Sequence, residues 1–391
     1  MKIKNKMVVA VDLGSSITKG FYKSESGTES VKYMLMGSEC FSLPEESVKY
    51  LHSRFKMGFP EDNAWIRASE DGETIAVGRM AREYSAYNRI KPLKAATIVP
   101  KLLAYIGAIA EKEKLDEAIE LNLGLLLPYS ELSAIGEIEK KLISALNEFY
   151  FCNRKYSVKI NRLRILPEAS GVALLQSLKD LESFRKIDRG FLMLGHRNTS
   201  FLVFERGSFS TTKSDTTIHG FYKFVEKFKE KVPGLENDDV FQIIQMQGKV
   251  DYDWQKDSYK LKERKLVFNL TALKRLKMEN FDFKSPYQAS LEEYSRLILS
   301  WLDEKMPSNI RVLSCLGGAT PFLIDKIKAK FPDCAIERPT SEIDDLWKAL
   351  NFDRHRYPEE FVKENLLERM MDVWSLFAIV GNIYKEEEVL V

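Results

Sequence analysis

The sequence has few of the residues from which disulfide frameworks, zinc sites and hydrolytic triads are built. Its 391 residues include only four cysteines and four histidines, and both kinds are scattered along the chain. No two cysteines form a C-x-x-C pair and no histidine stands at metal-ligand spacing, so neither a disulfide framework nor a zinc site is predicted. A Ser/His/Asp or Cys/His catalytic arrangement is not found either. We expect the cysteines to be buried as small apolar residues.

Long apolar runs and an excess of one charge are also missing. The chain has 59 Lys and Arg residues against 57 Asp and Glu residues, a net charge of +2, whereas proteins that bind nucleic acid directly usually carry a strong basic excess. No run of about 18 apolar residues exists, and the apolar stretch near the N-terminus is too short for a signal peptide. We therefore predict a cytoplasmic protein with no transmembrane segment and no direct nucleic-acid binding. Because 45% of the residues are hydrophobic, the chain can bury a core.

The two commonest phosphate loops, the Walker A pattern and the Rossmann G-x-G-x-x-G, are absent. A different pattern occurs twice instead. An apolar run over residues 7–11 leads into a turn with Asp12, glycine and serines, after which a strand pattern resumes. About 180 residues later an apolar run over 191–194 leads into a polar turn and a second apolar run. The repeat predicts a duplicated architecture with a cleft between its halves.

Strands alternate with helices over the rest of the chain, which predicts an α/β fold. A buried helix is predicted over 95–106, a core strand over 121–127 and an amphipathic helix over 138–149. Residues 220–308 have a charged, mostly helical pattern. Their basic run at 256–277 is more typical of a solvated helix face than of a nucleic-acid or subunit contact.

Three further segments have patterns that predict local structure. Pro167 and Glu168 are predicted to open a helix, with the carboxylate in the first turn, where the helix dipole favours it. A strand over 311–316 leads into a Gly-Gly turn, followed by Thr320 as the helix cap and by a proline. Two glycines at such a turn allow the backbone to approach a flat ligand, although Gly-Gly is also a generic turn. A final helix is predicted over 358–385.

In this order, the elements resemble the actin-like ATPase superfamily, and specifically its bacterial ParM/StbA-type branch. The resemblance rests on residues 10–19, 167–169, 316–319 and 378–384 and spans nearly the whole chain. It implies an actin-like fold, with two duplicated α/β domains of the RNase H-like type flanking an interdomain nucleotide cleft. It also implies ATP and Mg²⁺ as cofactors.

The resemblance assigns a role to each matching residue. Glu168 is the catalytic residue that positions the hydrolytic water, and Asp12 holds Mg²⁺ through water. The phosphate-binding residues are Asp12, Gly14, Ser15, Ser16, Thr18, Lys19, Gly195, Asn198 and Thr199. The adenosine-binding residues are Gly317, Gly318 and Ala319.

The second phosphate motif departs from the family's pattern. Met193 stands where the first aspartate of that motif belongs, and Ser200 stands at the other acidic position. A thioether cannot replace a carboxylate near Mg²⁺, so the departure implies weaker metal binding or slower ATP hydrolysis.

The resemblance also divides the chain into domains. Actin-like domain I covers residues 1–185, with a peripheral lobe over about 30–95. Actin-like domain II covers 186–352, with a helical insertion over about 220–308. Residues 353–391 form a C-terminal helix that returns to domain I.

The leading functional hypothesis is a ParM-like protein that binds ATP and polymerises with itself into cytoskeletal filaments. Its role would be plasmid or DNA segregation through an adaptor protein that links the filament to its cargo. Three alternatives stay open: a chromosomally encoded filament that organises cell shape, a nucleotide-binding scaffold with weak or no hydrolysis, and a small-molecule kinase of the same fold. A kinase needs a general base for its acceptor hydroxyl, and none is identified.

Overall fold

The structure is a computed structural model of the 391-residue chain. The part that it describes consists of residues 5–25, 30–54, 58–84, 94–232, 234, 250–253, 258–261, 283–351 and 366–383. The chain divides into two compact units by its internal contacts. Unit 1 comprises Met1–Lys179, Asp344–Asn351 and Asp372–Val391, and unit 2 comprises Asp180–Ile343 and Phe352–Met371.

Unit 1 is built around a mixed sheet whose central strands follow the order β3-β2-β1-β7-β9. The bounds of these strands are β1 (Asn5–Leu13), β2 (Ile17–Ser24), β3 (Lys32–Gly37), β7 (Ala118–Leu127) and β9 (Arg154–Pro167). β1 runs antiparallel to β2 and parallel to β7, and β7 runs parallel to β9. The apolar run in β1 is buried on both faces of the sheet, as the sequence predicts for a central strand.

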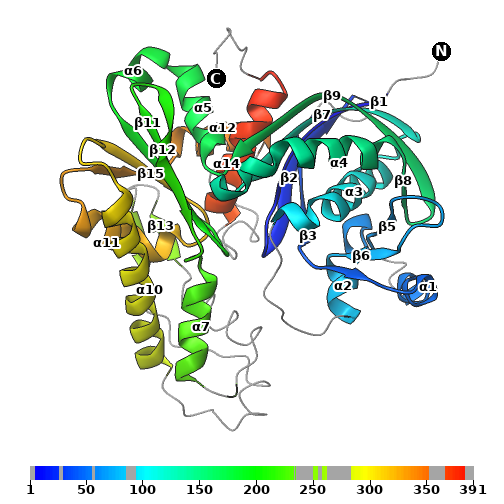
Figure 1. Ribbon diagram of the computed structural model, residues 1–391, viewed down its shortest axis with the longest axis horizontal. Helices are drawn as coiled ribbons and strands as arrows, with labels where there is room; N and C mark the ends of the chain where they lie inside the picture. The colour runs from blue at the N-terminus through cyan, green and yellow to red at the C-terminus, as the bar shows by residue number, and fades with distance from the viewer. Residues whose placement is uncertain are drawn as a thin grey trace. The chain divides into compact units, whose positions relative to one another are not determined.

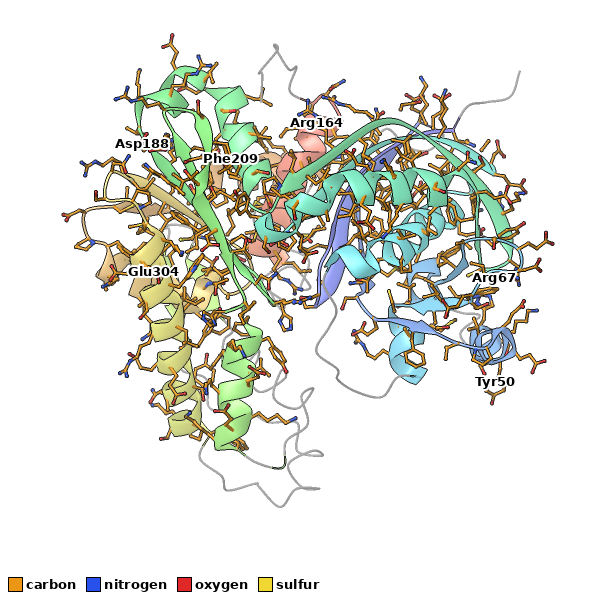
Figure 2. All side chains as sticks on the ribbon, in the orientation of Figure 1. Tyr50, Arg67, Arg164, Asp188, Phe209 and Glu304 are labelled. Atoms are coloured by element: carbon orange, nitrogen blue, oxygen red, sulfur yellow. The ribbon has the colours of Figure 1, made fainter. Side chains whose placement is uncertain are left out.

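The sheet of unit 1 continues beyond β9 into a peripheral part made of short antiparallel strands. In order these are β8 (Phe149–Phe151), β5 (Trp65–Arg67), β6 (Ile75–Val77) and β4 (Cys40–Ser42). The helices α1 (Glu45–Arg54) and α2 (Arg79–Tyr84) belong to the same part and enclose a small core around Trp65. Figure 2 shows Tyr50 pointing outward from α1, and its side chain is 65% exposed.

Two helices cover one face of the central sheet of unit 1 (Figure 1). They are α3 (Lys94–Lys112) and α4 (Ile135–Asn147), and a short 3₁₀ helix, η2 (Tyr129–Ala134), leads into α4. The apolar stripe of α4 is buried, as its 3.6-residue spacing predicts. No described helix in either unit has both the length and the apolar composition that crossing a membrane requires.

The sheet of unit 2 repeats the strand arrangement of unit 1. Its order is β12-β11-β10-β15-β16, with β10 antiparallel to β11 and parallel to β15. The bounds of its strands are β10 (Arg189–Leu194), β11 (Thr199–Glu205), β12 (Ser208–Thr217), β15 (Val312–Leu316) and β16 (Ala335–Glu337). Because a hairpin and a parallel neighbour recur in the same order, the predicted duplication of an α/β architecture is confirmed.

The helices of unit 2 enclose an aromatic core. α7 (Tyr222–Lys231) lies beside the long helix α10 (Lys284–Lys305), as Figure 1 shows. The rings of Phe224 and Tyr287 join these two helices at a centroid distance of 5.3 Å. The remaining helices that begin in this unit are α6 (Leu181–Lys186), α11 (Thr320–Lys330), α12 (Thr340–Ala349) and α14 (Leu366–Val380), the last two of which continue into segments of unit 1.

Two segments differ from the sequence prediction, and others lie outside the part of the chain that the structure describes. β9 is a strand of 14 residues that was not predicted, since a bulge at Asn161 interrupts its apolar alternation. Residues 220–308 are not uniformly helical, because β13 (Val250–Asp253) and β14 (Ser258–Leu261) pair there as a hairpin. The rest of the basic run at 256–277 lies outside the described residues, as do the ends of the helix predicted over 358–385.

Candidate functional site

The turn between β1 and β2 brings a carboxylate and an ammonium group together. Asp12 and Lys19 are directly opposite each other across the hairpin, and the Lys19 ammonium donates a hydrogen bond to the Asp12 carboxylate. Both residues are buried, at 9% and 8% exposure. A Cβ at Gly14 would lie 2.5 Å from the carbonyl oxygen of Ile17, so only glycine fits this turn. The turn lies at the carboxyl end of a central strand, where α/β sheets bind ligands.

A second buried lysine reaches the same turn. Lys101 on α3 is 4% exposed, and its Nζ donates a hydrogen bond of 3.2 Å to the carbonyl oxygen of Gly14. The Ser38 hydroxyl donates to the carbonyl oxygen of Ser15 at 2.7 Å, which fixes the next residue of the turn. Sequence reasoning missed Lys101, although a lysine inside an otherwise apolar helix is a signal that could have identified it. Lys101 thus adds a second ammonium group beside the Asp12–Lys19 pair at this glycine turn.

Ser15 and Ser16 occupy the turn itself and are half-buried, but Thr18 lies on the other face of the hairpin. Adjacent residues of a strand point to opposite faces, and Thr18 pairs with Leu13 while Lys19 pairs with Asp12. The Thr18 hydroxyl is buried and makes no hydrogen bond. The structure therefore does not bring Thr18 together with the other predicted phosphate-binding residues of this turn.

Glu168 lies in the turn between β9 and α5 (Ser170–Lys179). The prediction that Pro167 and Glu168 open the helix is wrong, because β9 ends at Pro167 and the helix begins at Ser170. The physical reason is Ala169, whose φ of +77° is incompatible with a right-handed helix. The Glu168 backbone N–H donates to the carbonyl oxygen of Leu127 at 2.7 Å, so the turn is fixed to the end of β7. A capping role therefore does not explain this buried glutamate.

Asp372 on α14 is a further buried carboxylate of unit 1, and sequence reasoning missed it. Its carboxylate accepts hydrogen bonds from the backbone N–H groups of Ala169 and Val172, at 2.6 Å and 3.2 Å. The pKa of Asp372 is raised from 3.8 to about 7, mainly by burial and also by the negative charges of Asp12 and Glu168, while the two hydrogen bonds act in the opposite direction. The charges of both Asp12 and Glu168 thus act on the Asp372 carboxyl group.

The corresponding turn of unit 2 is closed by its own backbone. The Gly195 N–H donates to the carbonyl oxygen of Asn198 at 3.1 Å, and a Cβ at Gly195 would lie 2.7 Å from that oxygen. Thr199 is fully buried, and its hydroxyl donates to the carbonyl oxygen of His219 at 2.9 Å. The hydroxyl hydrogen of Thr199 is therefore already used, and the half-buried Asn198 is the more accessible of the two polar side chains.

The glycine turn of residues 317–319 lies next to this second turn within unit 2. The parallel pairing of β10 and β15 places Met193 opposite Leu316, and the Ala319 N–H donates to the carbonyl oxygen of Leu194 at 3.3 Å. Gly317 has a φ of +92°, and a Cβ there would lie 2.5 Å from the Leu194 oxygen and 3.0 Å from the Met193 sulfur. The structure thus brings the two predicted nucleotide motifs of unit 2 together, with Met193 at their junction.

The helix after this turn begins one position earlier than predicted. α11 starts at Thr320, and Ala319 is the residue at its N-cap, so Thr320 is not the cap. The reason is that the Thr320 N–H already donates to the carbonyl oxygen of Gly317 and closes the turn. The Thr320 hydroxyl is buried and has no hydrogen-bond partner.

The first turn of α14 fixes the glycine turn of unit 2. The carbonyl oxygen of Glu368 accepts the Gly317 N–H at 3.1 Å, and the Glu368 carboxylate forms a buried ion pair with Arg338. The aliphatic part of Arg369 packs against Gly318, because a Cβ there would be 3.1 Å from its Cγ and Cδ. None of these three charged residues was selected from the sequence.

Within the described ranges, no three or more His, Cys, Asp or Glu residues are grouped so as to hold a metal ion. Asp12 contributes a single carboxylate with its ion-pair partner Lys19. Mg²⁺ is usually held by one or two carboxylates and several waters, so a magnesium site does not require three grouped carboxylates.

Solved structures match the chain over almost its entire length. The apo pSK41 ParM protein matches with a TM-score of 0.56 at 12% identity, covering 98% of this chain and 100% of that chain. The Alp12 filament structure matches with a TM-score of 0.54 at 16% identity, covering 97% and 100%. Ta0583, an archaeal actin homolog in complex with ADP, matches with a TM-score of 0.58 at 12% identity, covering 96% and 99%. This chain has an actin-like fold.

The actin-like fold is confirmed here by structure and not by sequence. No protein-family model matches the sequence, and no curated protein matches it either. The resemblance to ParM-type proteins that the four sequence motifs indicate is thus confirmed at the level of the fold. At 12–16% identity an actin-like fold does not by itself carry ligand or activity over to this chain.

Proposed function

We propose that this protein binds Mg²⁺-ATP, polymerises into filaments and hydrolyses the nucleotide slowly. The observation that carries the proposal is the arrangement at Gly14, where Asp12, Lys19 and Lys101 meet at a turn that only glycine can form. The Lys19 ammonium lies against the Asp12 carboxylate, and the backbone N–H groups and hydroxyls of such a tight turn can contact phosphate oxygens. A polyphosphate is therefore the anion that we propose for this site.

The residues present fit both predicted cofactors. In unit 1, Gly14, Ser15, Ser16 and Lys19 would contact phosphate oxygens, and Asp12 would hold Mg²⁺ through water. In unit 2, the turns containing Gly195 and Gly317 would contact phosphate and adenosine. Bound Mg²⁺ would offset the negative charge of the phosphates. The ADP complex of an archaeal actin homolog with the same fold supports a nucleotide as the ligand.

Glu168 would orient the attacking water. It is buried, its backbone is fixed to the end of β7, and it is electrostatically coupled to the same carboxyl group as Asp12. Catalysis of phosphoryl transfer to water depends mainly on positioning, so one fixed carboxylate suffices for this role.

Met193 favours a slow enzyme or a scaffold that binds nucleotide without hydrolysing it. The thioether lies at the junction of the two unit 2 turns, at the position where the second phosphate motif of the family carries an aspartate. This observation keeps the scaffold as the second candidate function.

Filament formation is proposed from the fold and from exposed side chains of the peripheral part of unit 1. The filament structure of Alp12, which shares the fold, supports self-association. Phe41, Tyr50 and Phe59 are large hydrophobic side chains exposed at 43%, 65% and 66%, as interaction surfaces often are. An adaptor that links the filament to plasmid DNA or another cargo completes the proposal.

Nucleotide binding is tested with Asp12→Asn. Isothermal titration calorimetry should show Mg²⁺-ATP affinity reduced by about 10–100-fold, because the variant loses the carboxylate that orients the hydrated metal. Asp116→Asn is the matched control, since Asp116 is exposed in the same unit and should leave affinity unchanged. Equal affinities for wild type and Asp12→Asn would show that the metal is held elsewhere.

Hydrolysis is tested with Glu168→Gln. Phosphate release in Mg²⁺-ATP should fall by roughly 10²–10⁴-fold, because the amide cannot act as a base, while nucleotide affinity is retained. Glu117→Gln alters an exposed glutamate of unit 1 and should release phosphate at the wild-type rate. If the wild type releases no more phosphate than Glu168→Gln, the ATPase proposal is wrong and the nucleotide-binding scaffold becomes the better account.

A further inference from the structure

The C-terminal helix α14 contributes one carboxylate to the segment that carries Glu168. Asp372 is only 1% exposed, and its two oxygens accept the N–H groups of Ala169 at 2.6 Å and of Val172 at 3.2 Å. Val172 lies in the first turn of α5, whose first N–H groups have no partner within the helix, and Ala169 immediately precedes that helix. A residue about 200 positions away in the sequence therefore satisfies the backbone immediately after Glu168.

The backbone at this point needs an external support. Ala169 has a φ of +77°, a conformation that non-glycine residues rarely adopt, and its side chain is fully buried. The local hydrogen bonds act on either side of it: Glu168 N–H donates to the Leu127 oxygen, and the Ser170 hydroxyl donates to the Pro167 oxygen at 2.5 Å. Ala169 itself accepts a hydrogen bond of 3.4 Å from the Ala173 N–H, and its own N–H donates the shorter bond of 2.6 Å to Asp372.

The two helices approach closely enough to make this contact rigid. A Cβ at Gly171 would lie 2.3 Å from the carbonyl oxygen of Asp372 and 2.7 Å from its Oδ1. Glycine at 171 is thus what allows α14 to bring its carboxylate against the backbone of α5.

A carboxylate at this position is unfavourable for stability alone. Asp12 and Glu168 are near enough for their charges to act on Asp372, and all three groups are buried. Apolar packing would avoid both the desolvation cost and the repulsion between like charges. Asp372 accepts two hydrogen bonds from the backbone that follows Glu168, and an apolar side chain could not accept them.

We propose that Asp372 is a positioning residue, which holds the Pro167–Val172 turn so that the Glu168 carboxylate is fixed for the attacking water. The proposal rests on the hydrolytic role proposed for Glu168. It assigns to α14 a direct part in setting the hydrolysis rate, through the backbone and without contact with the nucleotide.

The test uses Asp372→Asn and Asp372→Ala in the full chain, with Asp116→Asn as the exposed control. Asn keeps one acceptor and Ala keeps none, so kcat for Mg²⁺-ATP hydrolysis should fall in that order, reaching roughly 10²-fold for Ala. The nucleotide Kd should change less than about twofold, since the phosphate turn is untouched. Thermal melting identifies any variant that fails to fold.

Hydrogen exchange supplies a readout that does not require activity. In the wild type, the amides of Ala169 and Val172 should be protected, and Asp372→Asn should weaken the protection of one or both while leaving the amides of β1 unchanged. Rapid exchange of both amides in the wild type would overturn the proposal even if every variant unfolded.

The kinetic outcomes separate the two proposals. If the wild type hydrolyses ATP and Asp372→Ala retains its kcat, only the positioning role of Asp372 is overturned. If the wild type does not hydrolyse ATP at all, the hydrolytic role of Glu168 fails and the role of Asp372 fails with it.

Discussion

At the scale of single residues, buried charges mark the candidate site of unit 1. Lys101 stands within an apolar helix and Asp372 within another, yet both side chains reach backbone groups of turns far away in the sequence. Lysine and aspartate are almost never fully buried without a partner or a purpose. Each of these two residues therefore identifies a turn of the candidate site.

The pH dependence of stability tests the environment of Asp372. Its pKa is raised from 3.8 to about 7 in the folded protein, so the folded state retains a proton that the unfolded chain has lost. Stability should therefore fall as pH rises from about 4 to 7, by up to about 1.4 kcal/mol per pH unit, and remain lower above pH 7. The Asp372→Asn variant lacks this ionisation.

The measurement is the free energy of unfolding of wild type minus that of Asp372→Asn, by urea denaturation at several pH values without nucleotide or Mg²⁺. This difference in the free energy of unfolding should decline as the pH rises from about 4 to 7. A difference that stays constant, or that increases with pH, would contradict the raised pKa.

The sequence alone could predict some of these residues and not others. Asp12, Gly14 and Lys19 were predictable because they are within eight positions of one another around a turn. Asp372 and Arg338 were not, because their partners are distant in the sequence and helical periodicity says nothing about which backbone group a buried charge will meet. The one available signal was a charged residue in an apolar run.

At the scale of elements, α14 is part of the core of unit 1. Trp374 is 1% exposed, and its ring lies 5.3 Å from Phe21 of β2 in an edge-to-face arrangement. Gly124 of β7 provides room for this helix, since a Cβ there would be 2.8 Å from Leu376 and 3.0 Å from Val380. The C-terminal helix therefore packs directly on the central sheet.

Trp374→Ala should lower the free energy of unfolding by about 3–5 kcal/mol, because it leaves a cavity between α14 and the sheet. Tyr50→Ala is the control, since its ring is 65% exposed and its loss should change stability by less than about 0.5 kcal/mol. Urea denaturation measures both. A loss for Trp374→Ala no larger than that for Tyr50→Ala would show that α14 does not pack on β2.

Element prediction succeeded where a regular pattern is uninterrupted and failed where local geometry intervenes. β1 and β7 lie where their apolar runs predict strands, and α4 follows the predicted periodicity as far as Asn147, whereas Phe149, predicted as the end of that helix, lies in β8. The bulge in β9 shifts the apolar alternation of that strand by one residue, and the positive φ of Ala169 moves the start of α5 to Ser170. Bulges and positive φ angles of this kind depend on tertiary contacts between residues far apart in the sequence, and no local sequence pattern indicates those contacts.

At the scale of the whole molecule, the two sheets of the same strand order explain why the fold was predictable at 12–16% identity. Because the pattern of a hairpin followed by a parallel strand occurs twice in the sequence, each copy supports the same predicted architecture. The net charge of +2 also fits self-association, since a nearly neutral chain with 30% charged residues can assemble with little net repulsion. In the proposed filament, head-to-tail contacts that do not close into a ring would give an open polymer.

Light scattering on addition of Mg²⁺-ATP, with electron microscopy of the same samples, tests the central claim most directly. Above a critical protein concentration, scattering should rise and filaments should be visible, whereas Asp12→Asn at the same concentration should stay unassembled. Glu168→Gln should assemble and should disassemble more slowly than wild type, because hydrolysis no longer weakens its contacts. If the wild type shows neither scattering nor filaments at any concentration at which it remains folded and binds Mg²⁺-ATP, the proposal that this actin-like protein forms filaments is wrong.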